Sequence, residues 1–260
     1  MHIAESDQPF VEALAREAGA LLMRYQREGF EVAHKGAIDL VTTADRASDQ
    51  LISRALAARY PSHLVISEED AAKPQAVDGA PVWYVDPLDG TTGFAHGYPA
   101  FAVSIGLYER GEARLGVVYD PTRDELFSAR LGHGARLNGQ PIHVSRTNRL
   151  IESLLTSGFP YDIGESGSNL AEYQRLTLLS RGVRISGAAA LDLAWVACGR
   201  VDGYWEPEIA PWDGAAGALI VREAGGQATH YDNRDWKPSR SPVVASNGQL
   251  HRLLLDQINP

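Results

Sequence analysis

The chain has 260 residues, of which 44% are hydrophobic and 22% are charged, so it can bury the core of one large domain or of two smaller ones. Its formal net charge of −9 argues against a broad nucleic-acid-binding surface, which needs clustered Lys and Arg, but allows a small phosphorylated substrate. No apolar stretch is long enough to span a membrane and no secretory signal is visible, so we expect a cytoplasmic protein. Cys198, the single cysteine, excludes an intrachain disulfide and is expected to be a small buried hydrophobe.

The first 61 residues predict two helices. One begins near Pro9 and ends at Gly29, with apolar residues at helical spacing between them. The second covers residues 45–60 and is stopped by Pro61. Residues 38–44 between the two helices are expected to form a short extended or turn segment.

From residue 63 onwards the hydrophobic period changes to that of strands. Six strands are predicted before Arg146, at residues 63–67, 82–85, 101–108, 115–119, 125–129 and 142–144. Their connections are too short for crossover helices, which predicts a largely antiparallel sheet. After Arg146, strands at 151–156, 183–186, 203–206 and 243–246 alternate with helices at 168–179, 188–198, 213–223 and 250–257.

This change of pattern divides the chain into an α+β half, residues 1–146, and an α/β half, residues 147–260. No repeat, low-complexity segment or long linker separates them. We therefore expect the two halves to pack together, with a site between them.

The most informative stretch follows the apolar strand 82–85 and reads Asp86-Pro87-Leu88-Asp89-Gly90-Thr91-Thr92. Two carboxylates three residues apart, with a carbonyl between them, can face one hard cation. The glycine and threonines that follow offer backbone N–H groups and hydroxyls to an anion beside that cation. A metal and an anion in one loop suggest phosphate chemistry.

Other acidic residues stand where one predicted element gives way to the next: Asp39 with Asp45, the run Glu68-Glu69-Asp70, and Asp213. Each has a simpler explanation, because Asp45 and Asp213 can cap helices and the acidic run can be a solvated turn. Taken together they indicate more, since carboxylates that converge on one place repel one another unless cations are present.

Five stretches of the chain resemble the successive signatures of the inositol monophosphatase family. In order they are residues 39–45, 67–69, 83–94, 187–206 and 212–226. The resemblance implies a layered α/β/α/β/α sandwich and a Mg²⁺-dependent phosphate-monoester hydrolase, with Mn²⁺ as the alternative ion. It also implies lithium sensitivity, a homodimer and a small phosphorylated polyol as substrate, with no nucleic-acid or membrane partner expected.

Carried over position by position, the resemblance implies a metal site whose ligands are Glu68, Asp86, the Leu88 carbonyl, Asp89 and Asp213. Asp45 and Thr91 would orient and deprotonate the attacking water, with Glu68 beside them as a catalytic residue. The α+β half would thus hold most of the ligands, and the α/β half would supply Asp213.

The resemblance also implies two groups of substrate contacts. The phosphate would be held by Gly90, Thr91 and Thr92. The alcohol part would be contacted by Glu206 and by the backbone around Gly187, Ala188 and Ala189.

Three positions depart from the usual family pattern. Gly93 replaces Asn, Ala188 replaces Ser or Thr, and Gly214 replaces a bulkier residue early in a helix, where glycine costs about 1 kcal/mol relative to Ala. None removes a proposed ligand, so these departures bear on substrate preference. The leading hypothesis from the resemblance is an inositol-1-phosphate phosphatase that tolerates other sugar or polyol phosphates. Histidinol phosphate, fructose 1,6-bisphosphate and a 3′,5′-bisphosphate nucleotide are the alternative substrates, although Thr92-Gly93 counts against the last.

Two further alternatives concern the whole protein and single side chains. The chain could be a regulatory binding protein on this fold with incidental activity. Lys35 is either a screen for the acids or a solvent-facing Lys, and His96 is the one histidine close enough in sequence to the acidic loop to matter. Tyr204 and Trp205 are expected to be core residues.

Overall fold

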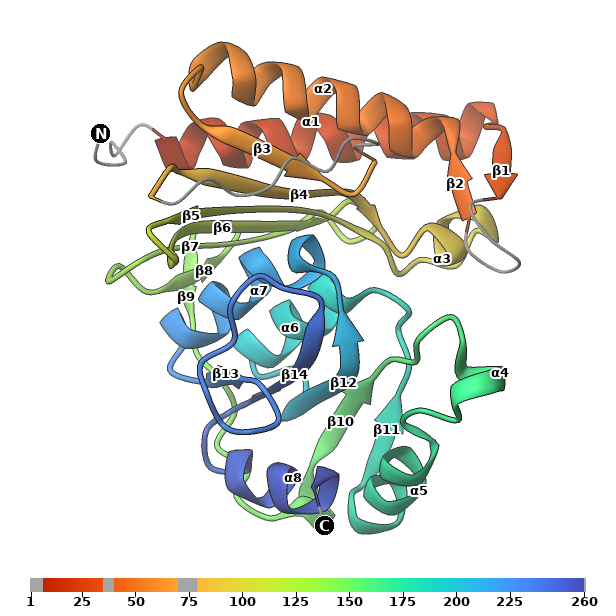
Figure 1. Ribbon diagram of the computed structural model, residues 1–260, viewed down its shortest axis with the longest axis vertical. Helices are drawn as coiled ribbons and strands as arrows, with labels where there is room; N and C mark the ends of the chain where they lie inside the picture. The colour runs from red at the N-terminus through yellow and green to blue at the C-terminus, as the bar shows by residue number, and fades with distance from the viewer. Residues whose placement is uncertain (1–6, 35–39, 70–78, 260) are drawn as a thin grey trace.

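The computed structural model describes residues 7–34, 40–69 and 79–259. Its helices and sheets are stacked in successive layers, with α1 and α2 at one end and α5 and α8 at the other (Figure 1). Asp39, Lys35 and Asp70, which the sequence analysis considered, lie outside the described residues. Within the described part of the chain, no helix is both long enough and apolar enough to cross a membrane.

The first layer is the helix pair α1 (Asp7–Glu28) and α2 (Thr43–Arg59). Leu14, Ala18 and Leu22 of α1 are buried, and so are Ile52 and Leu56 of α2, as amphipathic spacing requires. These side chains share one core cluster with the adjacent sheet. A two-stranded ribbon lies beside α3, made of β1 (Val32–His34) and β2 (Leu40–Thr42).

The second layer is a seven-stranded sheet with its strands in chain order from β3 to β9. Its members are β3 (Leu64–Ser67), β4 (Val82–Asp89), β5 (Ala102–Glu109), β6 (Glu112–Asp120), β7 (Glu125–Arg130), β8 (Ala135–Leu137) and β9 (Gln140–Ile142). Every neighbouring pair is antiparallel except β3 and β4, which are parallel. Short α3 (Thr91–Ala95) follows β4 directly.

The third layer consists of α6 (Ala189–Ala197) and α7 (Pro211–Glu223), which lie between the two sheets (Figure 1). Glycines permit the close approach of α7 to the seven-stranded sheet. A Cβ on Gly106 of β5 would lie 2.8 Å from Ala216 N, and one on Gly116 of β6 would lie 2.6 Å from Ala216 O. Gly214, an unexpected glycine in the first turns of α7, leaves room for Trp236, since a Cβ there would lie 2.6 Å from the indole ring.

The fourth layer is a five-stranded sheet with the order β11-β10-β12-β14-β13. Its members are β10 (Leu154–Ser157), β11 (Gly182–Arg184), β12 (Gly203–Ile209), β13 (Gln227–Thr229) and β14 (Ser241–Ser246). β10 is parallel to β11 and β12, whereas β14 is antiparallel to β12 and β13. The far side is covered by α5 (Leu170–Leu179) and α8 (His251–Ile258), and two short helices complete the chain, η1 (Leu150–Glu152) and α4 (Ile163–Ser166).

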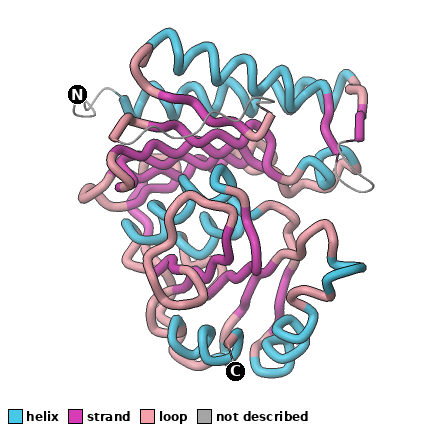
Figure 2. Tube along the Cα trace, viewed as in Figure 1, coloured by secondary structure: helices cyan, strands magenta, loops and turns pink. Residues whose placement is uncertain are grey.

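The predicted elements are confirmed in kind, and several boundaries shift. Figure 2 shows the strands of the seven-stranded and five-stranded sheets gathered into two separate layers, with helices between them and outside them. The sequence analysis missed the short elements β1, β8, β13, η1 and α4. The strand predicted at 142–144 is instead β9, which ends at Ile142, and Cys198 is partly rather than fully buried. Tyr204 and Trp205 are core residues as predicted, each with 0% exposure.

Candidate active site

An irregularity in β4 sets the directions of Asp86 and Asp89. In a regular strand, residues three apart point to opposite faces of the sheet. Here Asp86 pairs with Ser104 of β5, but Asp89 pairs with Ala102. Between these two pairs β4 therefore contains one residue more than β5. Such a bulge re-aims side chains. Both carboxylates consequently line the same pocket.

A left-handed turn at Gly90 joins this bulge to α3. Gly90 has φ +88°, and a Cβ there would also lie 2.8 Å from the Ala100 carbonyl oxygen, so glycine is required twice over. The turn places Thr91 and Thr92 in the first turn of α3. Because the first N–H groups of a helix have no acceptor within it, the backbone there can donate to a ligand.

Thr91 and Asp45 form a buried hydrogen-bonded pair at the edge of the pocket. The Thr91 hydroxyl lies 2.9 Å from Asp45 Oδ1 and 3.1 Å from the Leu88 carbonyl oxygen. A hydroxyl has a single proton, so it donates to one of these acceptors at a time. When it donates to Asp45, the Leu88 carbonyl is left to accept from another group.

Asp45 also performs the capping role that the sequence analysis considered. Thr42 is the N-cap of α2, and its backbone N–H donates to Asp45 Oδ2 at 2.8 Å, which completes a capping box. The capping box fixes the Asp45 carboxylate, and its other oxygen is the one that accepts from Thr91. Capping and participation in the site are therefore compatible. Burial raises the pKa of Asp45, which makes its carboxylate a stronger base.

Asp213 and Asp89 are each anchored to a helix start. Asp213 stands in the first turn of α7, and its Oδ2 accepts from the Ala210 backbone N–H at 2.8 Å. Asp89 Oδ2 accepts from the Ala190 N–H of α6 at 2.7 Å, which ties β4 to the helix layer. In each aspartate the hydrogen bond uses Oδ2 and leaves Oδ1 available to a ligand in the pocket.

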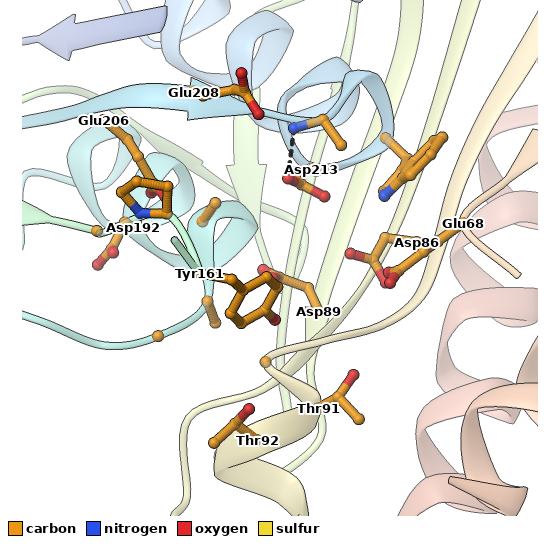
Figure 3. A pocket seen from close by; sticks show the side chains of 18 of the residues that line it. Glu68, Asp86, Asp89, Thr91, Thr92, Tyr161, Asp192, Glu206, Glu208 and Asp213 are labelled. Carbon is orange, nitrogen blue, oxygen red and sulfur yellow. Dashed lines mark hydrogen bonds between the residues drawn. The ribbon is translucent and has the colours of Figure 1, made fainter. Parts of the chain in front are cut away.

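The pocket that these residues line has a volume of about 670 Å³, a size suited to a small ligand. It has two ends (Figure 3). We call the end that holds Glu68, Asp86, Asp89, Asp213 and Thr91 the acidic end. We call the opposite end, which holds Asp192 and Glu206, the far end. Gly158 also lines the pocket and lies beside Glu206, since a Cβ on it would be 2.1 Å from Glu206 Oε2.

The carboxylates of the acidic end act on one another electrostatically. Burial, and then the charge of Glu68, raises the pKa of Asp86 well above its usual range. The pKa of Asp89 is likewise raised well above its usual range by burial and then by Asp213. Burial and Glu68 raise the pKa of Asp213 to about 8, while Arg240 opposes the shift. The largest charge effects on Asp86 and Asp89 all come from acids.

The donor set of the acidic end fits a hard divalent cation. It offers oxygen atoms only, and buried acids whose pKa values are raised by neighbouring acids need a cation to be ionised together. In residues 7–34, 40–69 and 79–259, no three His, Cys, Asp or Glu side chains are already drawn together closely enough to enclose one ion. Side-chain adjustment would therefore accompany binding.

The far end contains the predicted alcohol contacts. Glu206 accepts a hydrogen bond from the buried Tyr204 hydroxyl at 2.6 Å, and burial raises its pKa to about 7. Gly187, Ala188 and Ala189 also line the pocket, and the first two lie beside Gly90, since a Cβ on Gly90 would be 3.3 Å from Gly187 O and 3.2 Å from Ala188 Cβ. Ala188 has a methyl group at the position where the family usually has the hydroxyl of Ser or Thr.

All the predicted site residues except Asp45 line this pocket. Asp45 does not line it but accepts a hydrogen bond from Thr91, which does. His96 is exposed and does not line the pocket. The sequence analysis assigned no role to Gly158, Tyr161, Asp192 or Arg240, all of which line it. Asp192 could have been suspected, because it is a charged residue inside the otherwise apolar run of α6.

Comparison with known proteins agrees with the fold. The family model described as "Inositol monophosphatase family" matches residues 4–259. The inositol-1-monophosphatase of Synechocystis sp. is 47% identical over 91% of this chain and 83% of that protein. The Nus factor SuhB of Pseudomonas aeruginosa is 41% identical over 95% of this chain and 93% of that protein. The structure of inositol monophosphatase from Anabaena (Nostoc) sp. superposes with a TM-score of 0.88 and 43% identity, covering 98% of this chain and 95% of that one.

A layered fold with a pocket of buried acids beside a Thr–Asp pair is that of a phosphoric monoester hydrolase. The chain belongs to the inositol monophosphatase family. Its relatives are generally metal-dependent, in keeping with the oxygen donors of the acidic end.

Proposed function

We propose that the chain hydrolyses inositol monophosphate with Mg²⁺, releasing inositol and phosphate. The observation that carries this proposal is the pair Thr91–Asp45, 2.9 Å apart, set against the carboxylates that the β4 bulge turns into one pocket. A proton-accepting pair next to an oxygen-only cation site is what water attack on a phosphate monoester requires.

The residues that would hold Mg²⁺, or Mn²⁺ in its place, are Glu68, Asp86, Asp89, Asp213 and the Leu88 carbonyl. When bound, the ion would lower the pKa of a water molecule and neutralise charge on the attacking and leaving oxygens. The chain's contribution is to fix these donors. Leu88 N–H donates to Asp86 Oδ1 at 3.0 Å, and the N–H groups of Ala190 and Ala210 fix Asp89 and Asp213.

Thr91 and Asp45 would accept the proton of the attacking water. A threonine hydroxyl is a poor base by itself, but the Asp45 carboxylate takes the hydroxyl proton and frees the oxygen to accept another. The capping box keeps Asp45 in place during this exchange. Glu68, which the resemblance groups with these two, lines the same end of the pocket.

The phosphate would be bound by the start of α3. Gly90 lets the backbone approach, and the N–H groups of Thr91 and Thr92, in the first turn, have no acceptor within the helix. The Thr92 side chain is exposed, so its hydroxyl is available as well.

The charges of the far end support a leaving group without a second phosphate. A bisphosphate needs a cationic partner for its distal phosphate. Among the described residues that line the pocket, Arg240 alone is basic, and it is paired with Glu208 at 3.0 Å. Glu206 and Asp192 at the far end would repel a second phosphate but accept hydrogen bonds from hydroxyl groups. They would also accept an ammonium group, which favours histidinol phosphate as the second candidate.

The test is phosphate release from inositol 1-phosphate, histidinol phosphate, fructose 1,6-bisphosphate and adenosine 3′,5′-bisphosphate, with and without Mg²⁺. We expect Mg²⁺-dependent release that is fastest with inositol 1-phosphate. Asp256→Asn, in an exposed ion pair on α8, is the matched control and should behave as the wild type. Faster release from either bisphosphate would contradict the proposed substrate, and release without a divalent cation would contradict the proposed chemistry. The homodimer, the lithium sensitivity and the cytoplasmic location stay predictions.

A further inference from the structure

The side chain of Glu206 occupies space that only a glycine leaves free. Glu206 is on β12, and Gly158 follows β10, the neighbouring parallel strand. A Cβ on Gly158 would lie 2.1 Å from Glu206 Oε2 and 2.8 Å from Oε1, well inside van der Waals contact. The backbone of Gly158 has no positive φ, so alanine is conformationally acceptable there. The Glu206 carboxylate is therefore what excludes a side chain at position 158.

One hydrogen bond holds the carboxylate in that space. The Tyr204 hydroxyl, which is fully buried, donates to Glu206 Oε2 at 2.6 Å. Among the described residues, Tyr204 is the one donor to this carboxylate. A carboxylate accepts about four hydrogen bonds, so this bond leaves most of the acceptor capacity of Glu206 unused, and Glu206 lines the pocket.

The surroundings of Glu206 favour a ligand that donates. Asp192, buried nearby on α6, accepts from the Ser186 hydroxyl at 2.8 Å, and its Oδ1 has no hydrogen-bond partner within residues 7–34, 40–69 and 79–259. Burial and the charge of Glu206 raise the pKa of Asp192 well above its usual range. Both carboxyl groups line the pocket, so a ligand at this end meets acceptors rather than cations.

We propose that Gly158 and Tyr204 are positioning residues for Glu206, and that the wall they build selects leaving groups with hydrogen-bond donors over apolar leaving groups of equal size. The inference rests on the proposed hydrolase function and adds to it the basis of leaving-group choice. Gly158 supplies the space for the carboxylate, and Tyr204 supplies its orientation. An apolar ring at this wall would leave the carboxylate short of donors, which is costly.

The test compares two phosphate monoesters that differ only in ring hydroxyls, inositol 1-phosphate and cyclohexyl phosphate. The quantity measured is selectivity, the ratio of kcat/KM for the first to that for the second, with Mg²⁺ present. In Gly158→Ala, the new methyl group must push the flexible Glu206 side chain aside. We expect the selectivity to fall about tenfold, the effect of losing one hydrogen bond to a charged group, chiefly through KM for inositol 1-phosphate.

Two further variants separate positioning from a general structural effect. Tyr204→Phe removes the hydroxyl alone and should lower the selectivity in the same direction. In Glu206→Ala, the space beside residue 158 is empty, so adding Gly158→Ala should cause no further loss. The matched control is Gly164→Ala in nearby α4, where a Cβ meets nothing within 4 Å and both rates should match the wild type.

The outcomes distinguish this inference from the function on which it rests. If the wild type hydrolyses neither ester with Mg²⁺, the proposed function fails and the inference fails with it. If hydrolysis is normal but Gly158→Ala and Tyr204→Phe keep the wild-type selectivity, the inference alone is overturned. A Gly158→Ala effect that persists at full size in the Glu206→Ala background would also overturn it, because the two residues would then act independently.

Discussion

The two ends of the pocket both contain acids, but the acids are arranged in opposite ways. At the acidic end, burial and then a neighbouring acid raise the pKa values of Asp86, Asp89 and Asp213, the neighbour being Glu68 for Asp86 and Asp213 and Asp213 for Asp89. At the far end, Glu206 and Asp192 face hydroxyl donors from Tyr204 and Ser186. The carboxylates of the acidic end need a cation to be ionised together. Those of the far end already accept hydrogen bonds from neutral hydroxyl groups. The difference indicates which end performs the chemistry and which end recognises the leaving group.

The largest loss of activity is expected from a substitution at the acidic end. Asp213→Asn keeps the hydrogen bond from Ala210 N–H to a side-chain oxygen but removes one charge from the proposed cation site. Metal-ion charge stabilisation is worth several kcal/mol, so kcat/KM for phosphate release should fall by on the order of 10²- to 10³-fold. Steady-state phosphate release measures this loss, and circular dichroism checks that the fold is retained. Near-normal turnover would remove Asp213 from the site.

Thr91→Ala tests the proton-accepting pair at the same end. Without the hydroxyl, water has no bonded route to Asp45, and general base catalysis is typically worth about 10²-fold or more. We expect kcat to fall by about that factor while the Mg²⁺ concentration for half-maximal rate changes much less. A variant with normal kcat and weakened metal dependence would show that Thr91 serves the cation instead.

The acidic end should also make the metal-free protein sensitive to pH. The pKa of Asp213 is about 8 in the folded chain and about 4 when unfolded, so its proton stabilises the fold fully below pH 4 and this stability is lost as pH rises through 8. Thermal unfolding in EDTA should therefore show a decline in stability across this window, on the order of several kcal/mol with Asp86 and Asp89 included. Added Mg²⁺ should reverse the decline at pH 8. A flat profile in EDTA would contradict the electrostatic account.

A smaller effect is expected at the far end. Glu206→Gln removes the charge but keeps the size of the side chain. The pKa of Glu206 is about 7, so KM for inositol 1-phosphate should rise in the wild type as pH falls through 7 and the carboxylate is protonated. In the variant, KM should be about tenfold higher and should lack this pH step. If the step persists in the variant, another group is responsible for it.

The smallest effect concerns the rim between the two ends. Arg240 is exposed, pairs with Glu208 and lowers the pKa of Asp213. Because Arg240 is a positive charge that repels a bound cation, Arg240→Ala should strengthen apparent Mg²⁺ affinity by about two- to threefold at low salt and by less at high salt, as screening predicts. Arg234→Ala, which removes an exposed Arg paired with Asp232 in the same loop, is the control. If the two variants change Mg²⁺ affinity equally, the effect of Arg240 comes from the net charge of the protein and not from its position at the pocket.

The acidic end was predictable from sequence because its residues are concentrated in one loop and in signatures around it. Asp86, Asp89, Thr91 and Asp213 all line the pocket where the resemblance implied. The bulge that turns Asp86 and Asp89 the same way could not be predicted, since it depends on pairing with β5. The strand-to-helix order was predictable from hydrophobic periodicity, whereas three-residue strands such as β8 and β13 carry too little periodicity to detect.

The far end was only partly predictable, and the reason is physical. Gly158 matters because of a side chain 48 residues away on a neighbouring strand, and a sequence gives no sign of that contact. Gly214 looked like a weak point of α7, but the Trp236 ring that fills its space is also distant in sequence. Tertiary contacts of this kind decide where glycine is required, so they become visible only in the folded chain.

The central claim is that folding gathers Asp86, Asp89 and Asp213 around a divalent cation. The most direct measurement is anomalous diffraction from crystals of the protein soaked in Mn²⁺, compared with crystals of Asp213→Asn treated in the same way. The account predicts one or more manganese peaks bounded by these carboxylates in the wild type, and a weakened or missing peak in the variant. Peaks only elsewhere on the molecule, or none at a concentration that supports full activity, would contradict it.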